Sequence, residues 1–176
     1  MNNTLWDQLE DRLGLKPGTL AHLHDEQGDW GRIVKAHAVV EATLNVRLAR
    51  RFPDLARVVT RLPFEHGLYG KLKTLRQGGW LQPNEEAFAQ ALYNLRSRLV
   101  HDVSYLDFDL DEVTDRWSRE NRARFVDAVF EFWHASNKLN LNAEWREAER
   151  ENVRLLLFAA TFRFMYDTDD LLRAAT

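Results

Sequence analysis

Residues 93–102, with the sequence YNLRSRLVHD, concentrate polar side chains at the end of a segment whose apolar residues predict a helix. Arg96, Arg98 and His101 are the members that could carry chemistry. A histidine has an ordinary pKa of about 6.5, so it can accept or release a proton near neutral pH. An arginine binds phosphate and stabilises negative charge. The simpler interpretation is a solvated helix end, where cationic side chains are favourable.

A single helix must position all of these side chains. Its core stripe consists of apolar residues at three- and four-residue spacing: Phe88, Leu92, Leu95 and Leu99. At about 100° per residue, Asn94, Arg98 and His101 align on another face, whereas Arg96 lies about 140° from His101. Helix geometry alone therefore favours Arg98 over Arg96 as the partner of His101.

The run from Arg96 to His101 resembles the R-x4-6-H motif of the HEPN superfamily of small all-α domains. A polar residue usually follows the arginine in that motif, as Ser97 does here. The order of elements is also similar: a helix with an Ala-x-x-x-Glu-like stretch ending near Glu41, a helix with Lys71-Leu72, a turn with Trp80-Leu81, and then the motif. The likeness spans about residues 30–110 and is closest to HEPN-like proteins of the mannitol operon repressor type.

The resemblance implies a metal-independent endoribonuclease, a toxin or defence effector, that cleaves RNA as a homodimer. Arg96 and His101 of two protomers would form the catalytic site and need no cofactor. The histidine would take a proton from a ribose 2′-OH or give one to the leaving 5′-oxygen, and the arginine would stabilise the phosphorane. The residues expected to bind RNA or support this pair are Asn94, Ser97, Arg98, Asp102, Tyr105 and Glu41.

A second interpretation keeps the fold without the activity, as a non-catalytic regulator or protein-interaction module. Arg96 and His101 would then be structural. In HEPN toxins that pair with a nucleotidyltransferase antitoxin, a tyrosine follows the histidine by two residues, whereas Val103 stands there in this chain and the nearest tyrosine is Tyr105. This departure counts against pairing with that type of antitoxin. The partners expected besides a second copy of the chain are an antitoxin or a regulatory protein. Six acidic residues between 102 and 115 would repel RNA from any cleft they lined.

The composition of the 176-residue chain excludes several other chemistries. It contains no cysteine, so disulfides, thiolate metal sites and cysteine nucleophiles are ruled out. His22 and His24, with Asp25 and Glu26, could ligate a metal, but they fall in a predicted loop, which favours a solvated segment. The chain has no membrane-length apolar run and does not begin like a signal peptide, so we expect a cytoplasmic protein without membrane contact.

The net charge of −3 is distributed unevenly. Counted along the sequence, residues 1–31 sum to −4, residues 32–101 to +7 and residues 102–176 to −6. The basic middle segment predicts a phosphate-binding groove beside the motif, unless its charges are spread over solvated helix faces. The groove would use some of the following side chains: Arg47, Arg50, Arg51, Lys71, Lys73 and Arg76.

The apolar spacing is helical throughout, which predicts an all-α, HEPN-like helical bundle of about six or seven helices in one domain over 1–176. A loop is expected over 17–29, with Asp29 as the N-cap of the following helix. The expected helices lie near 4–13, 29–52, 54–62, 68–77, 83–101, 118–137 and 143–167. Tyr93, Ser97 and Val100 form the face expected at a homodimer contact.

Overall fold

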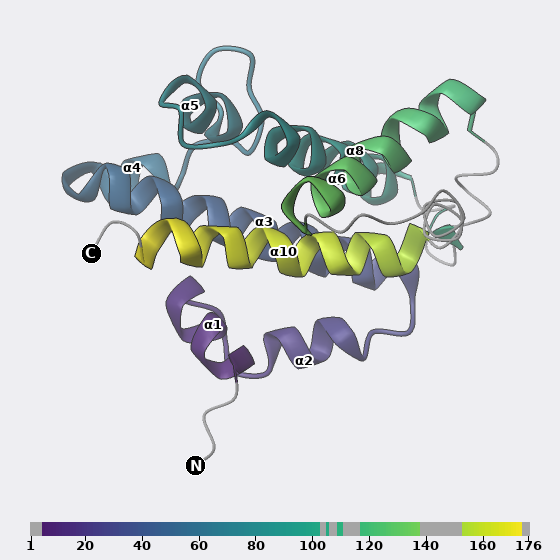
Figure 1. The fold of residues 1–176 in the computed structure, drawn as a ribbon, viewed down its shortest axis with the longest axis horizontal. Coiled ribbons are helices and arrows are strands. Elements are labelled where there is room, and N and C mark those ends of the chain that lie inside the picture. The colour runs from purple at the N-terminus through teal and green to yellow at the C-terminus, as the bar shows by residue number, and fades with distance from the viewer. Residues whose placement is uncertain (1–4, 103–104, 106–108, 111–116, 138–152, 174–176) are drawn as a thin grey trace.

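The computed structural model describes residues 5–102, 105, 109–110, 117–137 and 153–173. Within these ranges the chain forms eight α-helices, one 3-10 turn and no strand, so the all-α prediction is confirmed. Figure 1 shows their arrangement. The elements in chain order are α1 (Leu5–Leu13), α2 (Thr19–His24), α3 (Asp29–Arg51), the turn η1 (Pro53–Leu55), α4 (Ala56–Val59), α5 (Lys71–Gln77), α6 (Pro83–His101), α8 (Arg119–Asn137) and α10 (Val153–Arg173).

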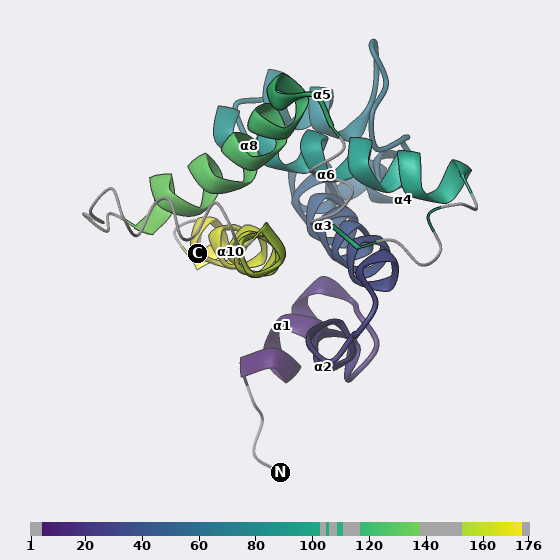
Figure 2. The same cartoon turned by 90° about the vertical axis from the view of Figure 1, so that its right-hand side faces the viewer.

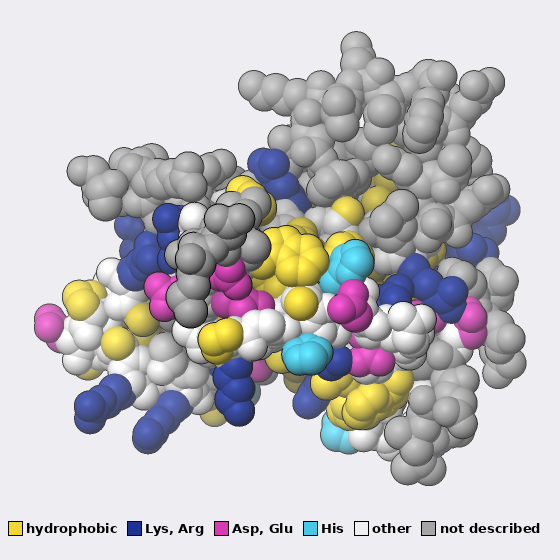
Figure 3. All heavy atoms as spheres, turned by 90° about the horizontal axis from the view of Figure 1, so that it is seen from below, with side chains coloured by type: hydrophobic (Ala, Val, Ile, Leu, Met, Phe, Trp, Pro, Cys, Tyr) yellow, Lys and Arg dark blue, Asp and Glu magenta, His cyan; other side chains and the backbone are white. Residues whose placement is uncertain are grey.

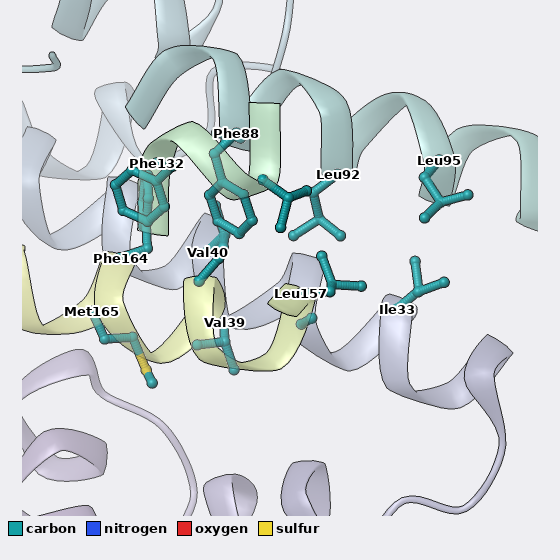
Figure 4. Packing of buried hydrophobic residues seen from close by; sticks show 14 of the residues in the cluster. Ile33, Val39, Val40, Phe88, Leu92, Leu95, Phe132, Leu157, Phe164 and Met165 are labelled. Carbon is teal, nitrogen blue, oxygen red and sulfur yellow. The ribbon is translucent and has the colours of Figure 1, made fainter. Parts of the chain in front are cut away.

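Four long helices form a closed ring around the core. Helix α3 packs against α6, α6 against α8, α8 against α10, and α10 back against α3 (Figures 1 and 2). Three phenylalanines meet where these helices face one another: the Phe88 ring lies 4.9 Å from Phe132, and Phe164 lies 5.8 Å from both (Figure 4). All three side chains are fully buried, and this burial of large apolar side chains stabilises the ring of helices.

Helix α2 is the element that the sequence did not predict. Residues 19–24 form a short helix inside the expected loop. The buried Glu10 carboxylate on α1 accepts hydrogen bonds from the backbone N–H groups of Gly18 and Leu20, both at 2.6 Å. These bonds satisfy N–H groups at the start of α2 that have no partner within the helix. The stabilising group lies on another helix, which is why local sequence signals did not indicate α2.

Asp29 begins α3 but does not cap it as predicted. The N-cap is Gly28, and the buried Asp29 carboxylate instead accepts hydrogen bonds from the Leu110 backbone N–H at 2.8 Å and from Arg154 Nε at 2.7 Å. Arg154 also binds Asp109 at 2.5 Å, and its hydrogen bond to Asp29 contributes most to raising the pKa of its guanidinium. A buried carboxylate needs such partners, and here they tie α10 and residues 109–110 to the start of α3.

Helix α5 begins later than predicted. Leu68, at the expected start of this helix, is 77% exposed in the loop before it. The helix ends as expected: Gly79 follows it with a φ of 70°, a left-handed conformation that favours glycine, and the Trp80 N–H donates to the Leu75 carbonyl at 2.9 Å. The two glycines at 78–79 are therefore explained by the geometry at the end of the helix.

The C-terminal helices agree with the prediction in part. Helix α8 spans 119–137, close to the expected 118–137. Helix α10 spans 153–173 and continues beyond the expected end at 167, while residues 143–152 lie outside the described part of the chain. Over the described ranges, none of the helices combines the length and apolar character that crossing a bilayer requires.

Candidate functional site

Helix α6 carries the candidate motif and is held at its N-terminus by a buried ion pair. Pro83 occupies the first turn, and the Glu85 carboxylate accepts a hydrogen bond from the Gln82 backbone N–H at 2.7 Å. The same carboxylate receives Arg47 Nη2 of α3 at 2.6 Å, and both side chains are only 5% exposed. This cap and ion pair set the position of α6 against α3 and hence the direction in which the motif residues point.

The last turn of α6 is held by α3 as well. The indole N–H of Trp30 donates to the Leu99 carbonyl at 3.4 Å. The helix runs unbroken to His101, and the extended backbone of Asp102 ends it. His101 is exposed. Because Arg96 and His101 share one continuous helix, they lie about 140° apart around its axis, as helix geometry predicted.

A groove of about 350 Å³ separates α6 from the start of α8. Asn94 and Arg98 are exposed along it, and the Arg98 guanidinium lies 5.2 Å from the centre of the Trp117 ring, a cation–π contact. We call it the α6–α8 groove. Its lining residues are Ala87, Gln90, Ala91, Asn94, Leu95, Arg98, Trp117, Asn121, Arg124, Phe125 and Ala128.

The α6–α8 groove is cationic and rich in amides. Arg98 and Arg124 are its two cations, and Arg124 forms an exposed i,i+4 ion pair with Glu120. The Gln90 side-chain amide donates to Asn94 Oδ1 at 3.1 Å. An aromatic ring, arginines and amides on one concave surface can bind a ligand that has flat rings, anionic groups and hydrogen-bonding edges.

Arg96 lies on a different side of α6, towards α3. Its positive charge helps to lower the pKa of the His37 imidazole. His37 is 6% exposed, and its ring centre lies 4.5 Å from that of Phe64. Burial lowers the pKa of His37 to about 4; Glu41 opposes this shift, while Arg96 and Lys71 add to it. Its Nε2 is buried without a hydrogen-bond partner among the described residues. The imidazole is therefore neutral at neutral pH.

Glu41, one of the predicted supporting residues, belongs to this buried cluster. It forms an ion pair with Lys71, whose side chain is only 3% exposed at the start of α5. Tyr93 stacks on Phe64 of its own chain with ring centres 5.1 Å apart and is half-buried, and its place at a homodimer contact stays a prediction. The groups around His37 thus come from α3, α5, α6 and the loop before α5, and they serve packing within one protomer.

The predicted site residues therefore divide between two sides of α6. Asn94 and Arg98 line the α6–α8 groove. The charges of Arg96 and Glu41 instead shift the pKa of His37, in opposite directions. Ser97 is half-buried, Asp102 is exposed, and Tyr105 is half-buried with its N–H donating to the Asp102 carbonyl at 3.1 Å. Val103 lies outside the described residues.

Sequence reasoning missed the contribution of α8. Trp117, Asn121 and Arg124 complete the α6–α8 groove. Their spacing is consistent with one face of a helix, but nothing in the sequence indicates that this face meets Arg98. Trp117, which precedes α8, is half-buried: it lines the groove and also packs against the core, with its ring edge-on to that of Phe125.

Two of the six side chains from which the basic groove was expected to draw lie in buried ion pairs. Arg47 and Lys71 are buried in ion pairs with carboxylates, so they are not available to phosphate. Arg51 lies over the Trp80 ring at 5.4 Å, and Arg76 pairs with Glu86 at 3.3 Å. On the lower side of the molecule, where α1 and α2 lie, lysine and arginine side chains stand in separate groups with carboxylates between some of them (Figure 3).

Both histidines considered as metal ligands lie on α2 rather than in a loop. His22 and His24 are exposed, and His24 Nδ1 hydrogen-bonds to Asp25 Oδ1 at 2.8 Å. In the part of the chain that the structure describes, no three histidine, aspartate or glutamate side chains are arranged to hold a metal ion.

Comparison with known proteins adds no relative. No protein-family model matches the chain, and neither a curated protein nor a solved structure matches it.

Proposed function

We propose that the protein is a metal-independent endoribonuclease of the HEPN type that works as a homodimer and binds RNA in the α6–α8 groove. The observation that supports this best is the placement of Arg98 over Trp117, on the helix face that leads to the exposed His101. In this proposal Arg98 is the arginine that meets the phosphate, and Arg96 is a structural residue.

The groove suits single-stranded RNA. A base can stack on the Trp117 indole, and base–aromatic stacking tolerates any sequence because every base has a flat face. The guanidinium of Arg98 can bind the adjacent phosphate, and the amides of Asn94 and Asn121 can donate to and accept from base edges.

Proton transfer is assigned to His101. The neutral imidazole of one protomer removes the proton from a ribose 2′-OH, and the 2′-oxygen forms a bond to phosphorus. The phosphorus–5′-oxygen bond breaks, and the protonated His101 of the partner subunit gives its proton to the leaving oxygen. Arg98 stabilises the added negative charge on the phosphorane. The products are a 2′,3′-cyclic phosphate and a 5′-hydroxyl.

The test is cleavage of a defined RNA in EDTA by the wild type and three variants, with the product ends analysed. His101→Ala should reduce cleavage by roughly 10²-fold or more. Because the side chain is exposed, this change should alter the free energy of unfolding by no more than about 0.5 kcal/mol. Arg98→Gln should lower both RNA affinity and rate. Arg96→Gln is the matched control, two residues away on another side of the helix, and should leave cleavage near the wild-type level.

Two results would contradict parts of this proposal. If Arg96→Gln abolishes cleavage in a folded protein while Arg98→Gln does not, the motif arginine acts and the groove does not hold the reacting phosphate. If sedimentation finds a monomer at micromolar concentration that still cleaves RNA, the two-protomer site is wrong.

A non-catalytic regulator or protein-interaction module is the second candidate. The observation that favours it is the half-buried Arg96 beside His37, which suits a structural role for the motif arginine. Exposed Leu68 and Tyr69 also suit a protein contact. If the wild type cleaves none of a varied set of RNAs, this second function is the better interpretation.

A further inference from the structure

A second hollow lies on the other end of the exposed face of α6. It has a volume of about 290 Å³ and lies between α5, α6 and the loop before α5. We call it the α5–α6 hollow; its polar lining includes Glu65, His66, Lys73, Arg76, Glu86 and Gln90. Gln90 also lines the α6–α8 groove. The two depressions therefore meet at one side chain on α6.

The loop beside this hollow holds an aromatic side chain that is exposed to solvent. The Lys71 N–H donates to the Pro63 carbonyl at 2.9 Å, which closes the loop. A Cβ at Gly70 would lie 2.4 Å from the His66 backbone nitrogen, so the close approach of the two backbones requires glycine. Tyr69 is 53% exposed, and its ring lies 3.7 Å from the His66 ring. The loop thus presents a stacked aromatic pair next to the hollow.

The charges in the α5–α6 hollow have both signs. Lys73 Nζ donates to the Gly67 carbonyl, and the Arg76 side chain is 68% exposed with Glu86 as its ion-pair partner at 3.3 Å. Glu65 and Glu86 oppose a phosphate, whereas Lys73 and Arg76 attract one. This hollow is consequently less favourable for RNA than the α6–α8 groove, which contains two arginines and has no carboxylate among its lining residues.

We propose that the α6–α8 groove and the α5–α6 hollow form one path for single-stranded RNA, with stacking sites at Trp117 and at the His66–Tyr69 pair. The inference rests on the proposed function and specifies its substrate. Arg98 and Glu86 are twelve residues apart on α6, which at 1.5 Å per residue is roughly 18 Å. A stacked strand, with a helical rise of about 3.4 Å per nucleotide, covers that length with roughly five nucleotides, and an extended strand covers it with fewer.

The path should select single strands over duplexes. Stacking on Trp117 and Tyr69 requires bases that are free on at least one face, and the bases of a duplex are stacked on each other. Length is the second criterion, because an RNA too short to reach from Arg98 to the α5–α6 hollow gains nothing from the second site.

The experiment measures fluorescence anisotropy of fluorescein-labelled oligouridylates of three and eight nucleotides, in EDTA and at fixed salt. His101→Ala is the background, because it prevents cleavage during the titration. The eight-mer should bind about tenfold tighter than the three-mer. Tyr69→Ala and Arg76→Gln should each weaken eight-mer binding about fivefold and leave three-mer binding unchanged, as expected for loss of one stacking or phosphate contact. Trp117→Ala should weaken both lengths.

Two further variants sharpen the test. Glu86→Gln removes a carboxylate from the hollow and should strengthen eight-mer binding. Arg57→Gln removes an exposed arginine of α4, which lines neither depression, and should change neither affinity beyond a small general charge effect. Circular dichroism and thermal melting of each variant establish that it is folded.

The outcomes separate this inference from the proposed function. If the eight-mer binds no tighter than the three-mer while Trp117→Ala still weakens both, the extended path is wrong and the α6–α8 groove stands. If Tyr69→Ala and Arg76→Gln weaken both lengths equally, the second site is not a separate one and the inference is also wrong. If neither RNA binds, both the path and the proposed function are overturned.

Discussion

His37→Leu should make the protein less sensitive to acid. Burial holds the pKa of His37 at about 4, whereas the unfolded chain titrates near 6.5. Above pH 6.5 the imidazole is neutral in both states and does not affect the pH dependence of stability. Between pH 6.5 and 4 the unfolded state binds the proton more readily, so stability falls as the pH falls through this window.

The size of the effect follows from the two pKa values. At about 1.36 kcal/mol per pKa unit, His37 should destabilise the fold by about 2 kcal/mol at pH 5 and about 3 kcal/mol at pH 4. The leucine variant has no such titration. At pH 7.5 the substitution replaces a buried ring whose Nε2 lacks a hydrogen-bond partner in the described structure, so its cost should stay below about 1.5 kcal/mol.

Urea unfolding from pH 7.5 to 4 provides the measurement. Groups distant from His37 are present in both proteins, so their contribution to the pH dependence cancels in the difference between wild type and variant. His22→Leu is the matched control, since it replaces an exposed histidine by the same residue. If wild type and His37→Leu lose stability in parallel between pH 7 and 4, His37 does not carry a depressed pKa and the reasoning fails.

Two further substitutions test the packing. Arg47→Met should lower the free energy of unfolding by about 3–5 kcal/mol, because it leaves the Glu85 carboxylate buried without its cation; urea titration at pH 7 measures this, and a loss below 1 kcal/mol would mean that water reaches the carboxylate. Gly70→Ala should cost about 1–3 kcal/mol by forcing the added Cβ away from the His66 backbone, whereas Gly67→Ala, with no atom within 4 Å of its Cβ position, should cost far less; equal thermal shifts for the two would contradict this.

Much of the fold could be predicted from the sequence because its signals are local. Apolar residues at three- and four-residue spacing predicted the face of α6 that is buried. The expected helix ranges also match a proline at the first position of α6 and a glycine with positive φ just after α5. Each of these signals depends on backbone geometry or burial within a few residues of its own position, so each can be interpreted without knowledge of the neighbours.

The angular separation of Arg96 and His101 was also determined by the sequence alone. A helix rotates by about 100° per residue, so the two side chains had to diverge once the segment was helical. The sequence did not determine which residues of the other helices contact each face of α6. The positions of α3 and α8 decided that Arg96 acts on a buried histidine and that Arg98 lies over Trp117.

The tertiary structure alone decided which charges are buried and which polar groups meet. The sequence did not predict that Arg47 and Lys71 form buried ion pairs. Their partners, Glu85 and Glu41, are 38 and 30 residues away along the chain. Glu10 likewise stabilises α2 from another helix. Side-chain periodicity predicts that a helix face is buried. It does not predict which helix covers that face, because the packing of whole helices decides this. The groove beside Arg98 exists for that reason: it forms only where α6 and α8 pack together.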